Sequence, residues 1–338
     1  MFSVLRRHWF LVGLLTLIPL ALAISGAGPP QRMIDVSNAV PTSWCTAAIL
    51  FLMSITLNSG RLLDSLRRPL PVMTACGVNQ LIVPLLCLPM LMLQRSADLK
   101  LGLLIAASVP CTMAAASVWT RRAEGNDAVS LLVTLITNGM CFLMTPLWLS
   151  VGNTWFGTAN STSGLGFNDM VLKLTVAALC PALAGQFFRM FAAVRIYVDG
   201  NKAWFSNTAQ VIILSLVFVS SFRGGLRFGE GGMSDHLRHT ELAIVWACCI
   251  VLHVAAMAVA WWITGAAKFG EEDRRACVIA GSQKTLPIGI LVSQSTGLPL
   301  SLIPMLMYHA SQLFIDTWVA DRMKARPLTG HKDVTVTV

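Results

Sequence analysis

Charged side chains are scarce in this sequence, in which Asp, Glu, Lys and Arg together make up 12% of 338 residues. A soluble domain carries about 25%. Hydrophobic residues reach 55%, and the mean hydropathy is +0.67. One membrane-spanning helix needs about 20 consecutive apolar residues, so ten such helices with short loops account for the whole chain. We therefore predict an all-α polytopic membrane protein without a sizeable soluble domain.

The sequence also lacks the motifs of enzymes and ion channels. It contains no nucleophile elbow, no phosphate-binding loop, no paired carboxylates within an apolar run and no selectivity-filter repeat. Its nine cysteines lie mostly inside apolar segments without metal-ligand spacing, so we expect them to be packing residues. These absences favour a protein that is not an enzyme and that has no resident cofactor or metal.

Ten apolar segments are present, and prolines begin or break several of them. They are expected as helices over residues 9–25, 40–57, 69–93, 99–120, 126–151, 169–191, 204–221, 241–266, 274–295 and 298–320. The first segment follows Arg6 and Arg7 as a signal peptide would. It lacks a clear small-residue cleavage site, so we expect it to remain as the first helix.

The net charge of +9 reflects membrane topology rather than a surface for nucleic acid. Its basic residues lie in short loops between the apolar segments. If successive loops alternate between the two sides, 17 of the 25 Lys and Arg residues fall on one side and seven on the other. By the positive-inside rule we expect both termini to be cytoplasmic, in the cell (inner) membrane. Ten spans satisfy the even number that this topology requires.

Two segments carry a polar, proline-containing interruption. One reads Ser-Val-Pro-Cys-Thr over residues 108–112, and the other reads Gly-Ser-Gln-Lys-Thr-Leu-Pro over residues 281–287. They are about half a chain apart, which predicts two five-helix repeats, over about 1–155 and about 165–325, within one transporter unit. Because five spans per repeat is an odd number, the repeats have opposite orientations. Matching interrupted helices in inverted repeats are the best sequence indication of a transport site, although two chance breaks are the alternative.

Lys284 is the most informative residue in the second interruption. A lysine at membrane depth costs about 2.5–3.5 kcal/mol on insertion scales. One interpretation is a structural cation that neutralises the carbonyl ends of broken helices. The other is an ammonium that binds substrate or exchanges the coupling proton. The two overlap, because a cation that fills an ion site serves both roles.

Other polar residues allow two interpretations each. Pro110 cannot donate a backbone hydrogen bond, so the nearby hydroxyls either repair a kink or mark the end of a half-helix whose N-terminus attracts an anion. Ser130, Thr134 and Asn138 share one helix face, as a site or as interhelical glue. Asn79 and Gln80 precede Pro84 and suit either a cavity wall or packing.

Three titratable residues within the predicted helices receive the structural interpretation. His253 and His309 lie within apolar segments, where a lone histidine is more often a hydrogen-bonded packing residue. Asp316 is predicted to lie near the inner end of the last helix and to pair with a nearby arginine.

Three stretches resemble the bile acid:sodium symporter family, most closely its SBF-like branch. They are PCTMAAASVWTRRAEGNDAVSLLVT from Pro110, AGSQKTLPIGI from Ala280 and NQLIVPLL from Asn79. The resemblance implies a panel domain and a core domain, with broken helices 4 and 9 crossing at mid-membrane. It also implies that organic anions pass between the domains by alternating access.

The resemblance further implies two sodium sites, which this sequence alters. Family sodium ligands correspond here to Ser117, Ser130 and Thr134 for one site and to Gln80 and Gln283 for the other. The family's shared glutamate corresponds to Ile279, which cannot bind a cation, and Lys284 has appeared beside both sites. We therefore predict degenerate sodium sites. The candidate substrate- and ion-binding residues are Gln80, Thr112, Ser117, Ser130, Thr134, Asn138, Ser282, Gln283, Lys284 and Thr285.

The sequence thus predicts a secondary transporter of a small organic anion that does not strictly require sodium, with sodium or a proton as the possible coupling ion. The alternative is a membrane scaffold or regulatory protein that keeps the fold without transport. A solvent-reachable cavity lined by Lys284, Gln283 and Thr112 would favour transport, whereas a dry crossover would favour a scaffold. The expected partners are the anion and the lipid bilayer, without nucleic acid; the sequence does not indicate the oligomeric state.

Overall fold

A computed structural model describes residues 9–57, 69–113, 115–157, 166–230, 239–298 and 300–325. Within these ranges the chain is helical and contains no β-strand. The helices are α2 (Trp9–Gly26), α3 (Gln31–Ala39), α4 (Thr42–Ile55), α6 (Pro69–Gly77), α7 (Val83–Leu91), α8 (Ala97–Ser108), α9 (Ala115–Arg122), α10 (Asp127–Phe156), α11 (Phe167–Leu174), α12 (Cys180–Arg189), α13 (Ala192–Gly200), α14 (Lys202–Glu230), α15 (His239–Ala266), α16 (Glu271–Ser282), α17 (Leu286–Ser295) and α18 (Leu302–Lys324).

Two π-helical segments join helices that would otherwise be continuous. They are η1 (Val78–Ile82), between α6 and α7, and η2 (Thr175–Leu179), between α11 and α12. Each lies just before a proline, Pro84 in one case and Pro181 in the other. Proline removes one backbone donor and clashes with the carbonyl four residues earlier, so the wider π turn relieves both problems.

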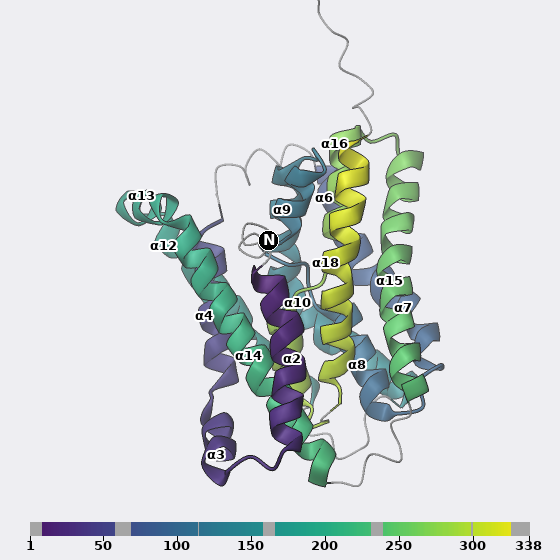
Figure 1. Ribbon diagram of the computed structural model, residues 1–338. Coiled ribbons are helices and arrows are strands. Elements are labelled where there is room, and N and C mark those ends of the chain that lie inside the picture. The colour runs from purple at the N-terminus through teal and green to yellow at the C-terminus, as the bar shows by residue number, and fades with distance from the viewer. Residues whose placement is uncertain are drawn as a thin grey trace, which may run out of the picture.

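The helices form two groups (Figure 1). The smaller group contains α2, α3, α4 and the helices from α11 to α14. The larger group contains the helices from α6 to α10 and from α15 to α18. Within the smaller group α14 packs against α2 and α4, and α12 packs against α4. A side-chain methyl at Gly185 of α12 would lie 2.8 Å from the Phe51 carbonyl oxygen of α4, so glycine permits this close contact.

All ten predicted segments are helical, but fewer meet the requirements for a membrane span. Six of the described helical segments are long and apolar enough, or seven if α3 and α4, bent by 50°, count as one span. The first predicted helix, α2, contributes a shorter apolar stretch from Val12 to Gly26. The sequence did not predict the short helices α3 and α13. The ten-span inverted repeat therefore stays a prediction.

Basic residues gather at one end of the larger helix group. There the end of α9 contacts the end of α18 through an ion pair of 2.6 Å between Arg122 and Asp321. Arg275 at the start of α16 donates to the Ala123 carbonyl at 2.8 Å. These positions agree with the predicted clustering of basic loops. Several other basic residues of that prediction lie outside the described residues: Arg6, Arg7, Arg61, Arg67, Arg68, Arg238, Arg326 and Lys332.

Candidate transport site at the helix crossover

The two interrupted helices meet directly, as the sequence predicted. The first break separates α8, which ends at Ser108, from α9, which begins at Ala115. The second separates α16, which ends at Ser282, from α17. The backbone N–H of Thr285 donates to the carbonyl of Pro110 at 2.8 Å, which joins one break to the other.

Lys284 lies in the second break and is fully buried. Its ammonium donates to the Asn79 carbonyl at 2.6 Å, to the Val109 carbonyl at 3.0 Å and to Asn79 Oδ1 at 3.4 Å. Val109 follows the last residue of α8, so this carbonyl belongs to the negative end of a helix dipole. The ammonium is thus surrounded by neutral oxygens of the kind that bind a metal cation.

The unwound backbone beside Lys284 is held by two side-chain amides. Gln312 of α18 accepts from the Lys284 N–H at 2.9 Å and donates to the Lys284 carbonyl at 3.0 Å. Asn79 Nδ2 donates to the carbonyls of Ala280 and Gly281, both at 3.3 Å, and of Gln283 at 2.8 Å. Because buried backbone groups must find partners, these amides make the interruption stable.

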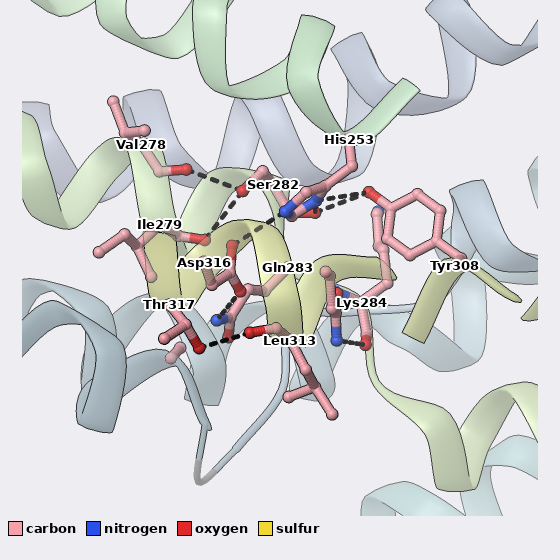
Figure 2. Close-up of polar contacts among 12 residues, drawn as sticks. His253, Val278, Ile279, Ser282, Gln283, Lys284, Tyr308, Leu313, Asp316 and Thr317 are labelled. Carbon is pink, nitrogen blue, oxygen red and sulfur yellow. Dashed lines mark hydrogen bonds and ion pairs between the residues drawn. The ribbon is translucent and has the colours of Figure 1, made fainter. Parts of the chain in front are cut away.

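Asp316 does not pair with an arginine, which corrects the sequence prediction. Its carboxylate is fully buried and accepts from His253 Nε2 at 2.9 Å and from Gln283 Nε2 at 2.5 Å (Figure 2). The helix continues to Lys324, so Asp316 lies two turns before its end and faces the crossover instead of the basic loops. Gln283 Oε1 in turn accepts from the Thr112 hydroxyl at 2.6 Å.

A cavity of about 710 Å³ lies between the two helix groups, above the crossover. Thr112, Thr285 and the first residues of α9 and α17 line it, together with Trp9, Phe10, Trp119 and His309. The polar side chains Asn207 and Gln210 of α14 face it from the smaller group. Gln283 and Lys284 are fully buried behind this wall. The cavity therefore reaches Thr112 among the three residues that were expected to line it.

Two arginines also line the cavity. Arg121 and Arg122 line it at the end of α9. Outside the spanning segments, the hydrogen bond to Asp321 raises the pKa of the Arg122 guanidinium, which keeps its charge.

The remaining candidates are distributed around the crossover rather than brought together in one site. Asn138 Nδ2 donates to the Cys111 carbonyl at 2.8 Å, while its buried Oδ1 has no partner. Ser130 and Thr134 donate to carbonyls of their own helix, Asp127 and Leu131. Three further candidates, Gln80, Ser117 and Ser282, are also buried.

Gln80 donates to Asn79 Oδ1, Ser282 donates to carbonyls within α16, and Ser117 lies in α9.

Sequence reasoning missed Tyr308 and Gln312 and assigned His253 and Asp316 to packing or to an arginine. The Tyr308 hydroxyl donates to the Ser282 carbonyl at 2.8 Å and lies 3.2 Å from His253 Nδ1. One signal was available, because ionisable residues inside apolar segments are functional candidates by default. Their partners lie on distant helices and were not identifiable from the sequence.

Residues 8–325 match the SBF-like CPA transporter family. The chain belongs to this family. It is 27% identical to a protein of Arabidopsis thaliana named probable sodium/metabolite cotransporter BASS4, chloroplastic, over 89% of this chain and 70% of that protein. It is 22% identical to sodium/bile acid cotransporter 7 of Xenopus tropicalis over 98% of each chain. An uncharacterized protein of Pseudomonas aeruginosa is 25% identical over 68% of this chain and 67% of its own.

Family membership and the apolar helices define the general class of the protein. It is an integral, multi-pass membrane protein of a transporter family and not an enzyme. Large apolar side chains on the outer surface agree with this setting, among them Trp44, Trp155 and Trp262, each more than 70% exposed.

Proposed function

We propose that this protein is a secondary transporter that moves a small organic anion by alternating access and that does not require sodium. The observation that supports it is the cavity above the crossover. The N-terminal ends of both half-helices, α9 and α17, face this cavity, and helix N-termini carry partial positive charge. An anion placed there lies next to Thr112 and Thr285, beside the break that contains Lys284.

The sodium independence follows from the position of Lys284. Its ammonium already donates hydrogen bonds to carbonyl oxygens of η1 and of the end of α8, so these oxygens are not free to bind sodium. Ile279, at the position of the family's shared glutamate, is fully buried and offers no oxygen from its side chain. A second cation a few ångströms from the ammonium would be repelled strongly in a low-dielectric environment. Lys284 thus serves as a permanently attached cation, and a proton is the remaining coupling ion.

The test is an uptake screen with the purified full chain in proteoliposomes. Radiolabelled carboxylates, sulfonates and organic sulfates are offered with and without sodium and with and without an inward pH gradient. We expect uptake of at least one class at the same rate in sodium and in potassium. A steep, saturable sodium dependence would contradict the role of Lys284. Absence of uptake for every class under all conditions would favour a scaffold.

A double variant tests whether sodium dependence appears when the attached cation is removed and a carboxylate is added. Lys284→Asn combined with Ile279→Glu removes the attached cation and supplies the missing carboxylate. We expect uptake by this variant to become sodium-dependent, whereas Ile279→Glu alone, which keeps the ammonium, stays independent of sodium.

A further inference from the structure

His253 is a buried titratable residue that the mechanism above does not use. It lies within α15, its side chain is fully buried, and both ring nitrogens have polar partners (Figure 2). Nε2 lies 2.9 Å from Asp316 Oδ1, and Nδ1 lies 3.2 Å from both the Ser282 carbonyl oxygen and the Tyr308 hydroxyl oxygen. The ring thus joins three helices at the end of α16, where the second break begins.

The partners of this ring suit two charge states. Tyr308 has one hydroxyl proton and donates it to the Ser282 carbonyl at 2.8 Å. In that arrangement both ring nitrogens face acceptors, and only an imidazolium donates from both. A neutral ring that donates to Asp316 needs a donor at Nδ1, which Tyr308 supplies if its hydroxyl turns away from Ser282. The orientation of the Tyr308 hydroxyl therefore follows the charge on His253.

We propose that His253, with Asp316 as its counter-ion, binds the proton that travels with the anionic substrate. This inference rests on the proposed function. The buried formal charges of Lys284 and Asp316 cancel, so a proton on His253 leaves one positive charge, which a monoanion in the cavity neutralises. Since uncompensated charge is costly in a low-dielectric interior, each ligand favours binding of the other.

A chain of hydrogen bonds connects this pair to the cavity. Asp316 Oδ2 accepts from Gln283, Gln283 Oε1 accepts from Thr112, and Thr112 lines the cavity. The charge on the His253–Asp316 pair is therefore separated from the anion by two side chains. The hydrogen bonds through Gln283 and Thr112 thus connect the proton site electrostatically to an anion in the cavity.

Other titratable groups surround the pair on the neighbouring helices. The thiols of Cys87 on α7, Cys111 beside α8 and Cys249 on α15 are fully buried in the same region as Tyr308. Lys284 directs its ammonium toward Asn79 and Val109, and His309 faces Gln312. On α16, Asp273 contacts Asn126 and Arg275 contacts Ala123 at the far end of that helix. Among these described groups, Asp316 and Lys284 are the ones close to the ring that carry a formal charge (Figure 2).

Infrared difference spectroscopy tests proton binding without a substrate. The full chain in lipid nanodiscs, free of sodium, is titrated with acid and base. We expect a histidine protonation band and a tyrosine C–O band that change together at one midpoint. His253→Gln should remove both bands, and Tyr308→Phe should remove only the tyrosine band. The matched control His309→Gln, another buried histidine, should keep both. A wild-type spectrum without the paired bands, or an unchanged pair in His253→Gln, would overturn the proposal.

Uptake then separates this inference from the proposed function. With the anion found by the screen, one proton per anion gives up to about a tenfold rate change per pH unit, the change in proton activity. We expect this response to fall below about twofold in His253→Gln and to persist in Lys284→Arg, which keeps a fixed charge. The reverse result would place the proton on Lys284. Uptake with an unaltered pH response in both variants would refute the inference and leave the anion transporter standing.

Discussion

Lys284 is held by the ends of other elements instead of by a counter-ion, so removing its charge has a predictable cost. In Lys284→Met the carbonyls of Asn79 and Val109 lose their donor. Each unsatisfied buried carbonyl costs about 1–3 kcal/mol. We expect the free energy of unfolding, measured by denaturation in detergent, to fall by roughly 2–6 kcal/mol for the two carbonyls together. Lys324→Met, at an exposed position at the end of α18, is the control and should change stability little. Equal stability of the two variants would contradict the hydrogen bonds described for Lys284.

For individual residues, the sequence correctly located those that are polar within an otherwise apolar segment. Lys284, Gln283 and Thr112 are polar groups within apolar, proline-containing segments, and all three lie at the crossover. Asp316 was misassigned because its partner depends on how far α18 continues and on which face meets α15. Those are properties of tertiary packing, which no local pattern encodes.

Among the elements, α12 and α4 show how close packing depends on one residue. A side chain at Gly185 would lie within 2.8–3.0 Å of Phe51, Ser54 and Ile55. We expect Gly185→Leu to separate the two helices and to lower stability by about 1–3 kcal/mol, the usual cost of overpacking. Gly139→Leu in α10 is the matched control, because nothing lies within 4 Å of its added Cβ. Thermal unfolding of both variants distinguishes packing from helix propensity, and similar melting temperatures would exclude this role for Gly185.

The sequence predicted elements well where a physical signal is local. Apolar length located the ten helical segments, and proline with polar residues located both breaks. The helices α3 and α13 were missed because each has only nine residues and lies where short connections were expected. The π-helical form of η1 and η2 was missed as well, since Pro84 and Pro181 are equally compatible with a simple kink.

For the whole molecule, the two helix groups are separated at one end and in contact at the other. Away from the cavity, Gln294 of α17 donates to Ser220 of α14 at 2.5 Å. If the groups rock against each other, this contact must open during each cycle. We expect cross-linking of Ser220→Cys with Gln294→Cys, by oxidation or a short bismaleimide, to abolish uptake, and reduction of the oxidised form to restore it.

The cross-linking variants are made in a protein in which the exposed Cys180 has been replaced, so that this thiol does not react. Each single cysteine variant, treated in the same way, should retain uptake. Full uptake by the cross-linked double variant would show that this contact stays closed during transport.

The positions of the ends of α10 and α18 give a separate prediction about membrane topology. The backbone N–H of Asn126, just before α10, donates to the Glu272 carbonyl at 2.9 Å near the basic end. From there α10 runs for 30 residues to Phe156. Met323 lies close to Asp321, which pairs with Arg122 at the basic end. We expect reporter fusions at Gly157 and at Met323 to lie on opposite sides of the membrane, with Met323 cytoplasmic. Reporters on the same side would refute the inverted repeat.

The presence of one attached cation and one attached anion at the crossover has an electrical consequence. Lys284 and Asp316 cannot leave the protein, and their charges sum to zero, so an empty carrier that returns across the bilayer does no work against the membrane voltage. A monoanion moving alone would meet about 2.3 kcal/mol of opposition per 100 mV when the interior is negative. Accompanied by one proton it crosses as a neutral complex. Accumulation would then follow the difference in acidity between the two compartments and would be indifferent to voltage.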